Sequence, residues 1–307
     1  MRAIKLYSTG DIRTVDVDVP SPAKNEILIK VEAAGICGTD RHLYHGEFPS
    51  VPEKILGHEF SGIVVDSGET DIAEGARVTC DPNTWCGACS QCQRGRVNLC
   101  PNNLATGIHR DGGFAEFCVF PASKAVVLPD EINPLHGAFC EPLACTLHGM
   151  DMGAAREGET VLVIGGGVIG LMAVQLAKLA GAEVLLLTRS PEKQALGLNI
   201  GADYAVGTES EVKNIWSEGA DLVVECAGVS ATVTLSHKLA RSGGRVVILG
   251  VISQGEQVPI EPFDMLCREM QMHVSFLHPF THKRAAKMIA DGTINVSPLV
   301  SRVISLE

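Results

Sequence analysis

The sequence predicts an α/β fold in which a doubly wound domain with a parallel sheet follows a mainly antiparallel β domain. Residues 161–187 have the pattern of a buried strand, a glycine-rich turn, a helix and a second buried strand. Further strand candidates follow at 203–206, 221–226 and 245–249. Before this unit, residues 14–19 and 26–31 alternate apolar and polar residues, which is typical of antiparallel strands.

The composition limits the classes of function. The 307 residues are enough for two domains with a sizeable core, and 46% hydrophobic and 20% charged residues are ordinary for a globular protein. The net charge of −11 argues against a nucleic-acid or membrane surface, because phosphate groups need a basic footprint. Residues 1–20 lack the apolar core of a signal peptide, so we expect a cytoplasmic protein. In such a chain the 11 cysteines indicate metal ligands or buried thiols rather than disulfides.

The glycine-rich turn follows the apolar run at 161–164 and has the spacing G-x-G-x-x-G. The first glycine permits the tight turn, the second lets the backbone approach a pyrophosphate, and the third lets helix and strand pack closely. The helix start directs free N–H groups toward the phosphates. A membrane span is the alternative, but Gln175, Lys178 and Glu183 interrupt the apolar stretch. We therefore predict a Rossmann dinucleotide site that includes Gly165, Gly167, Val168, Ile169 and Gly170.

The end of the second strand indicates which dinucleotide is bound. NAD sites usually have an acidic residue there for the ribose 2′-hydroxyl, whereas a nearby Arg accommodates the 2′-phosphate of NADP. Here the position is Thr188, followed by Arg189 and Ser190, with Lys193 one helical turn further along. A guanidinium and two hydroxyls suit a phosphate. We predict NADP, with NAD as second choice; a solvated Arg without a ligand is the alternative.

A first group of candidate metal ligands and proton carriers comprises Cys37, Thr39, His42, His58 and Glu59. Thr39 and His42 would share one face of a short helix. A thiolate, an imidazole and a carboxylate are suitable zinc ligands, and a catalytic zinc uses about three protein ligands and one open position. Spacing alone does not show that Cys37 meets His58. A buried thiol and a packed core histidine are the alternatives.

A second group is more specific, because its cysteines have the spacing C-x2-C-x2-C-x7-C. Four thiolates at this spacing suit a closed tetrahedral site that holds a structural zinc. Iron–sulfur ligation is the main alternative, and a disulfide pair is a weaker one. The four predicted ligands are Cys86, Cys89, Cys92 and Cys100.

In chain order, the motifs GxCGTDxH, GHE, the cysteine group and the glycine-rich unit resemble the medium-chain, zinc-dependent alcohol dehydrogenase family over essentially the whole chain. The resemblance implies a GroES-like catalytic domain over 1–146, with a structural zinc lobe at about 80–101. A Rossmann domain would cover 147–281, and residues 282–307 would return to the catalytic domain. Family members continue for a few tens of residues more, so we expect this return segment to be incomplete.

The resemblance also assigns roles. Cys37 and His58 are implied ligands of the catalytic zinc, and Glu59 is an adjacent carboxylate that ligates the ion or lies behind it. Thr39 would take the substrate proton, and His42 would pass it toward solvent. Loops with Cys226, Ala227, Leu249, Gly250 and Val251 would lie beside the cofactor's ribose and nicotinamide. Residues 112–120 resemble a family strand. The sequence pattern itself predicts a helix from about 281 and a strand at about 299–307.

Glu141, in the motif E-P-L, separates subfamilies. Simple-alcohol members of the family have a cysteine zinc ligand there, whereas E-P-L resembles the sorbitol, butanediol and threonine dehydrogenase branch. Cys140 and Cys145 are neighbours but are not in register. A surface glutamate before a helix-starting proline is the alternative.

Together these features predict a zinc-dependent dehydrogenase that transfers a hydride between NADP(H) and a secondary alcohol or ketone, such as a polyol or sugar alcohol. A threonine-type, NAD-dependent amino-alcohol dehydrogenase is the alternative, and a non-catalytic nucleotide-binding zinc scaffold is a more distant one. By family analogy we expect a homo-oligomer, a dimer or a tetramer.

Overall fold

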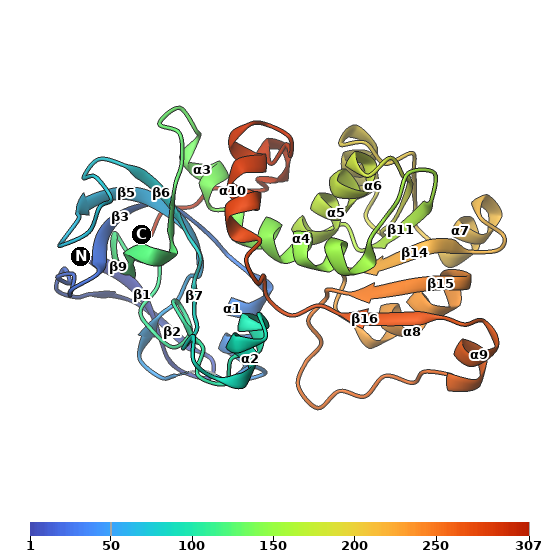
Figure 1. Cartoon of the computed structure of the whole chain (residues 1–307), viewed down its shortest axis with the longest axis horizontal. Helices are drawn as coiled ribbons and strands as arrows, with labels where there is room; N and C mark the ends of the chain where they lie inside the picture. The colour runs from blue at the N-terminus through green and yellow to red at the C-terminus, as the bar shows by residue number, and fades with distance from the viewer. Residues whose placement is uncertain (50, 307) are drawn as a thin grey trace. The chain divides into compact units, whose positions relative to one another are not determined.

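The computed structural model describes residues 1–49 and 51–306, which form two compact units. The N-terminal unit comprises Met1–Ala144 and Pro279–Glu307, and the central unit is Cys145–His278. In Figure 1 the N-terminal unit runs from blue to green and resumes in red, and the central unit runs from green to orange. These divisions lie a few residues from the predicted domain boundaries at 146 and 281, which stay predictions.

The N-terminal unit is built on antiparallel sheets. The larger sheet has the order β10-β6-β5-β3-β9, and all of its neighbouring strands are antiparallel. Alternate side chains of its strands, such as Ile27, Ile29, Phe60, Val78 and Phe120, form its buried core. The strands of this sheet are β3 (Glu26–Gly35), β5 (Glu59–Asp66), β6 (Arg77–Cys80), β9 (Phe117–Pro121) and β10 (Ala125–Val127).

Smaller elements complete this unit. A second antiparallel sheet has the order β2-β1-β4, and β7 pairs with β8. The strands are β1 (Arg2–Ser8), β2 (Asp11–Asp16), β4 (Lys54–Ile55), β7 (Asn83–Thr84) and β8 (Leu104–Ala105). The helices are α1 (Gly38–His45), α2 (Ser90–Gln93), α3 (Pro134–Gly137) and α10 (His282–Ala290), with 3₁₀ turns at Val97–Leu99, Ala122–Lys124 and Ser297–Leu299.

The central unit is a parallel sheet with helical connections. Its order is β13-β12-β11-β14-β15-β16, and every neighbouring pair is parallel. The strand order reverses between β11 and β14, and such a switch point opens a crevice at the carboxyl ends of the strands. The strands are β11 (Thr160–Ile164), β12 (Glu183–Leu187), β13 (Tyr204–Val206), β14 (Ala220–Glu225), β15 (Ala240–Ile248) and β16 (Gln271–Val274).

Helices follow the strands of this sheet in sequence (Figure 1). The helix α5 packs on β11 and β12, and α8 packs on β14 and β15. The chain enters the unit along α4 (Cys140–Gly153). The other helices are α5 (Val168–Leu179), α6 (Pro191–Asn199), α7 (Glu209–Ile215), α8 (Ser230–Leu239) and α9 (Pro262–Cys267).

The predicted fold class is confirmed, with one parallel and one mainly antiparallel unit. The strand predicted at 183–187 has those bounds in the structure, and the predicted C-terminal helix is α10. The strand predicted at 14–19 instead begins at Asp11 and ends at Asp16, where its pairing with β1 ends at Arg2.

Two predicted strands are wrong in part or over their described residues, one implied by the resemblance at 112–120 and one predicted from the pattern at 299–307, whose residue 307 lies outside the described chain. Only Phe117–Pro121 of the segment 112–120 is a strand, because Gly112, Gly113 and Phe114 use their N–H groups on carbonyl groups at 55–57. Residues 300–306 form no strand within the described chain. They are mostly exposed and pair with none of the described strands, and a strand without a partner leaves its backbone groups unpaired.

The glycine turn after β11 fixes how closely α5 approaches the sheet. Gly165 has a φ of +109°, which side chains rarely adopt. A Cβ added at Gly170 would lie 1.8 Å from the Gly165 carbonyl oxygen, whereas one added at Gly167 would meet nothing within 4 Å. The first and third glycines are therefore required by packing, and the second is not.

This contrast predicts different effects of two similar substitutions. Gly170→Ala should lower the free energy of unfolding by about 2 kcal/mol or more, because backbone must move to accept the methyl group. Gly167→Ala, the matched control, should change it by less than about 0.5 kcal/mol. Chemical denaturation of both variants measures the difference, and equal effects would contradict the packing role of Gly170.

Candidate metal centre and dinucleotide site

The structure brings Cys37, His58 and Glu59 together in the N-terminal unit. The Cys37 sulfur, a His58 ring nitrogen and a Glu59 carboxylate oxygen all lie within 4.8 Å of one another. The register of two strands explains this convergence, because Gly35 at the end of β3 pairs with Glu59 at the start of β5. Cys37 follows β3 by two residues, and His58 immediately precedes β5. The donor set therefore depends on a long-range strand pairing.

Asp40 holds two of these residues and was not identified from the sequence. Cys37 is the N-cap of α1, and its backbone N–H donates to Asp40 Oδ2 at 2.8 Å. The other carboxylate oxygen, Oδ1, lies 3.6 Å from His58 Nδ1, an ion-pair distance rather than a hydrogen bond. Asp40 is buried. The signal that could have found it is the capping-box spacing of positions 37 and 40.

Glycines leave the space that the cluster occupies. A Cβ at Gly35 would lie 2.3 Å from Glu59 Oε2, so this carboxylate occupies the space that a side chain would fill. Gly57 has a φ of +93°, and Cβ atoms at Gly107 or Gly112 would lie 2.4 or 2.3 Å from its carbonyl oxygen. The turn that presents His58 is therefore packed directly against backbone.

The electrostatics of the cluster favour a bound cation. Burial raises the pKa of the Cys37 thiol, and the Glu59 charge raises it further. Burial opposes charge on His58, but Asp40 and Cys37 outweigh it and hold the pKa of His58 well above its ordinary value. Burial, and next the Glu141 charge, raises the pKa of Glu59. Sulfur, nitrogen and oxygen donors of this kind fit zinc, whose charge would stabilise the buried anions.

Glu141 lies in the first turn of α4 and is buried, so it is not a surface residue. Its charge contributes to the raised pKa values of Cys37 and Glu59, which places it near both. It is not among the three residues whose donor atoms converge within 4.8 Å. The geometry groups Cys37, His58 and Glu59, and Glu141 acts on this group through its charge.

Thr39 and His42 lie on α1, three residues apart, as expected from the sequence. His42 Nδ1 is 2.7 Å from Glu47 Oε2, and only 12% of the His42 side chain is exposed. Because Glu47 occupies Nδ1, the second ring nitrogen is the one left for another partner. Glu47 was also missed in the sequence, where it follows α1 in a Gly-Glu pair without a recognisable motif.

The four cysteines at 86–100 also converge, with all sulfur atoms within 4.8 Å of one another. The Cys100 sulfur is 3.5 Å from that of Cys86 and 3.9 Å from that of Cys89, too far for disulfides. Thiolates around a tetrahedral zinc are about 3.8 Å apart, since each Zn–S bond is about 2.3 Å. An iron–sulfur cluster spreads its thiolates over separate irons, so these short separations fit a single ion better.

Backbone N–H groups support this lobe. Cys89 donates to the Cys86 sulfur at 3.4 Å, and Cys92 donates to the Cys89 sulfur at 3.5 Å. Backbone N–H groups of Ala88 and Cys89 lower the pKa of Cys86 to about 6, which favours the thiolate form. The turns therefore prepare the sulfurs to bind a cation.

In the central unit, the predicted cofactor residues gather at the carboxyl ends of the strands. The turn before α5 faces open space at Gly167, where a pyrophosphate could approach. A Cβ at Gly166 would lie 2.9 Å from both the Thr188 hydroxyl and the Lys193 Cβ. Arg189 is exposed, and Ser190 is the N-cap of α6. The end of β12 thus lies against the glycine turn, as a dinucleotide site requires.

The loops after β14 and β15 lie at the same edge. A Cβ at Gly165 would be 2.9 Å from the Ala227 nitrogen, and one at Gly228 would be 2.6 Å from the Val251 carbonyl oxygen. The predicted residues Cys226, Leu249 and Gly250 belong to these two loops. The site therefore has the close backbone packing that a dinucleotide cradle needs.

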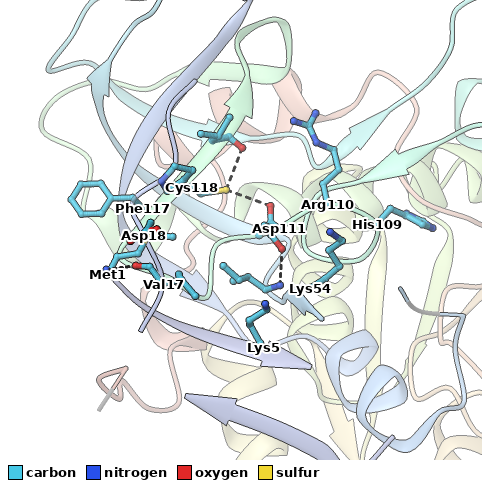
Figure 2. A pocket seen from close by; sticks show the side chains of 14 residues that line it. Met1, Lys5, Val17, Asp18, Lys54, His109, Arg110, Asp111, Phe117 and Cys118 are labelled. Atoms are coloured by element: carbon cyan, nitrogen blue, oxygen red, sulfur yellow. Dashed lines mark hydrogen bonds between the residues drawn. The ribbon is translucent and has the colours of Figure 1, made fainter. Parts of the chain in front are cut away.

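A cavity of about 490 Å³ lies elsewhere in the N-terminal unit (Figure 2). Lys5, Lys54 and Arg110 line it together with Asp18 and Asp111. None of the predicted site residues is among its lining residues. This cavity is therefore distinct from the candidate metal centre.

Comparison with known proteins assigns the chain to a family. Residues 23–130 match the alcohol dehydrogenase GroES-like domain, and residues 168–291 match the zinc-binding dehydrogenase domain. A sorbitol dehydrogenase from Halalkalibacterium halodurans is 36% identical over 261 residues, which are 81% of this chain and 76% of that protein. The chain belongs to the medium-chain, zinc-dependent alcohol dehydrogenase family. This dehydrogenase is an oxidoreductase of CH–OH donors, and the predicted family is confirmed.

Other relatives differ in substrate. D-arabinitol dehydrogenase 1 from Uromyces fabae is 31% identical over 319 residues, which cover 100% of the dehydrogenase and 91% of the relative. L-threonine 3-dehydrogenase from Bacillus licheniformis is 33% identical over 315 residues, covering 95% and 88%. Polyol and amino-alcohol dehydrogenases are therefore both among the similar proteins.

Solved structures share the fold, and one of them holds NADP and another NADH. A protein described as a zinc-binding dehydrogenase from Sinorhizobium meliloti 1021, bound to NADP, is 53% identical with a TM-score of 0.93, covering 96% of this chain and 89% of that one. An alcohol dehydrogenase from Escherichia coli CFT073, complexed with NADH, is 28% identical with a TM-score of 0.90, covering 97% and 90%. Among the described residues, no helix combines the length and the apolarity needed to span a membrane.

The two clusters should respond differently to loss of one ligand. His58→Ala should remove about one zinc ion per chain and abolish turnover with the fold retained, whereas Cys89→Ser should remove one ion and lower the Tm by roughly 5 °C or more. Metal analysis and thermal unfolding of both variants provide the measurement. Cys267→Ser, at an exposed cysteine on α9, is the control and should match the wild type. Unchanged activity of His58→Ala would remove His58 from the metal centre.

Proposed function

We propose that this dehydrogenase transfers a hydride between NADP(H) and a secondary alcohol or ketone, with polyols or sugar alcohols as substrates. The observation that carries the proposal is the buried convergence of Cys37, His58 and Glu59, with Glu141 beside it in place of a further cysteine. The names of the sorbitol and D-arabinitol relatives support the substrate class.

The metal centre would be held by Cys37 and His58 with one carboxylate, from Glu59 or Glu141. A zinc ion bound there supplies Lewis acidity that lowers the pKa of an alcohol hydroxyl. Asp40 would position Cys37 and His58, because it accepts a hydrogen bond from the Cys37 backbone N–H and lies at ion-pair distance from the His58 ring. Thr39 is proposed to accept the substrate proton, and His42 to pass it toward solvent while Glu47 orients its ring.

The carboxylates also bear on substrate class. Whichever of Glu59 and Glu141 does not ligate the metal remains a strong acceptor of hydrogen bonds. A polyol offers further hydroxyl donors next to the reacting carbon, whereas a simple alkyl alcohol offers none. A buried acceptor that finds a donor only on a polyol favours that substrate over an apolar alcohol.

The 2′-phosphate of NADP would be bound at the end of β12. Arg189 is exposed there, and Thr188 and Lys193 lie beside the glycine turn, without the carboxylate that usually binds the ribose of NAD. The NADP-bound dehydrogenase from Sinorhizobium meliloti supports this preference, although the Escherichia coli structure holds NADH.

A substrate panel tests the proposal and its alternative. The threonine dehydrogenase relative favours an NAD-dependent amino-alcohol activity as the second candidate. With zinc-loaded enzyme, the highest kcat/KM should occur for a polyol such as sorbitol or D-arabinitol with NADP, at least about tenfold above L-threonine and ethanol. The highest value for L-threonine with NAD would overturn the proposal. Inactivity with every alcohol would instead favour the non-catalytic scaffold.

A charge reversal tests the cofactor assignment. Arg189→Asp should weaken NADPH binding by about 100-fold, because a charge-assisted contact is lost and the new carboxylate repels the phosphate. NADH binding should change by less than about threefold. Fluorescence titration measures both dissociation constants. Lys238→Asp, an exposed charge reversal on α8, is the control for net charge, and equal loss of both cofactors would exclude Arg189 from phosphate binding.

A further inference from the structure

The central unit contains a buried carboxylate to which the proposed reaction assigns no role. Glu225 is the last residue of β14 and is fully buried. Its Oε1 accepts hydrogen bonds from the backbone N–H groups of Ala227 at 2.8 Å and Gly228 at 3.0 Å, and from the Thr232 hydroxyl at 2.7 Å. One oxygen of this side chain therefore fixes the loop that follows β14.

The backbone of the same residue fixes the next loop. The Glu225 carbonyl oxygen accepts the N–H groups of Leu249 at 2.8 Å and Gly250 at 3.0 Å. The loops after β14 and β15 are thus tied together at one residue. The first of them packs against the glycine turn at Gly165, with no room for a Cβ between them.

The second carboxylate oxygen has no such partner. Oε2 is buried and accepts no hydrogen bond from the described residues, and a Cβ at Gly250 would lie 2.6 Å from it. No ion pair within the described chain includes Glu225. Burial raises the pKa of Glu225, and the Thr232 hydroxyl and the backbone N–H groups of Ala227, Gly228 and Gly250 oppose that shift. Oε1 and the backbone carbonyl already hold the two loops, so the buried and unpaired Oε2 calls for a separate explanation.

We propose that Glu225 is a positioning residue for the nicotinamide half of the cofactor, and that its unneutralised charge favours the oxidised form of the ring. The oxidised nicotinamide is cationic and the reduced ring is neutral, so a fixed anion beneath these loops attracts only the oxidised ring. The inference rests on the proposed function, because it needs a bound dinucleotide, and on the family resemblance, which implies that these loops lie beside the ribose and nicotinamide. The glutamate thus acts through loop geometry and through its field, without contacting the reacting atoms.

The charge is tested by comparing three ligands in zinc-loaded protein. Glu225→Gln should raise the Kd of NADP⁺ about tenfold and that of NADPH less than about threefold. The Kd of 2′,5′-ADP, which occupies only the adenosine half, should stay within about twofold. Calorimetric titration provides all three values, and thermal unfolding shows whether the variant is folded. A merely structural role would change the Kd of NADP⁺ and that of NADPH by the same factor, and that result would overturn the proposal.

Thr232→Val is the matched variant, because it removes one donor to Oε1 and keeps the charge. It should leave the ratio of the two dissociation constants, NADPH to NADP⁺, at the wild-type value. A changed ratio of the two dissociation constants in Thr232→Val would contradict the proposal that the charge of Glu225 sets this ratio. This variant therefore tests the proposal even if Glu225→Gln does not fold. If the wild type binds no nicotinamide dinucleotide, the proposed function fails. If it binds both forms and Glu225→Gln leaves their ratio unchanged, only the role of Glu225 fails.

Discussion

The rest of the N-terminal unit depends on one constraint, the burial of carboxylates and an imidazole where β3, α1 and β5 meet. His58, Glu59 and Asp40 are buried together, and Cys37 lies against them. A buried anion is costly unless an opposite charge compensates for it. Asp40 and Cys37 raise the pKa of His58, and burial and the Glu141 charge raise the pKa of Glu59, so buried acidic groups crowd one another here. The donor set is therefore arranged for a cation, and its stability is linked to metal binding.

Both units use glycine where a side chain would block another group. Gly35 leaves space for the Glu59 carboxylate, and Gly170 leaves space for the carbonyl oxygen of Gly165. In the first case the space is filled by a candidate ligand, and in the second it lets a helix start close to a strand end. The same physical property thus makes room for a candidate ligand in one unit and for close helix–strand packing in the other.

Local patterns predicted the fold well, and long-range contacts decided the rest. The unit from β11 to β12 and the cysteine lobe could be predicted because their signals lie within a few residues of one another. The meeting of Cys37 with His58 could not be derived from spacing, because it depends on the pairing of Gly35 with Glu59. Asp40 was missed although its contact with Cys37 is local and has capping-box spacing, and only its approach to His58 depends on the folded chain. Glu47 and Glu225 also bond residues close in sequence, but no recognisable motif marks them. The strand expected near 299–307 was wrong because a strand needs a partner, which a local pattern does not show.

The charges in the central unit match the asymmetry of the proposed cofactor. NADP carries its extra phosphate at the adenosine end, where Arg189 and Lys193 provide cations in a chain with a net charge of −11. Its nicotinamide end becomes cationic on oxidation, and in the proposed binding mode that end lies near Glu225, a buried carboxylate with one oxygen unpaired by the described residues. Cations at one end and an anion at the other orient a dipolar ligand better than uniform positive charge, which would bind phosphate equally well in either direction. The arrangement thus supports orientation of the dinucleotide as well as affinity for it.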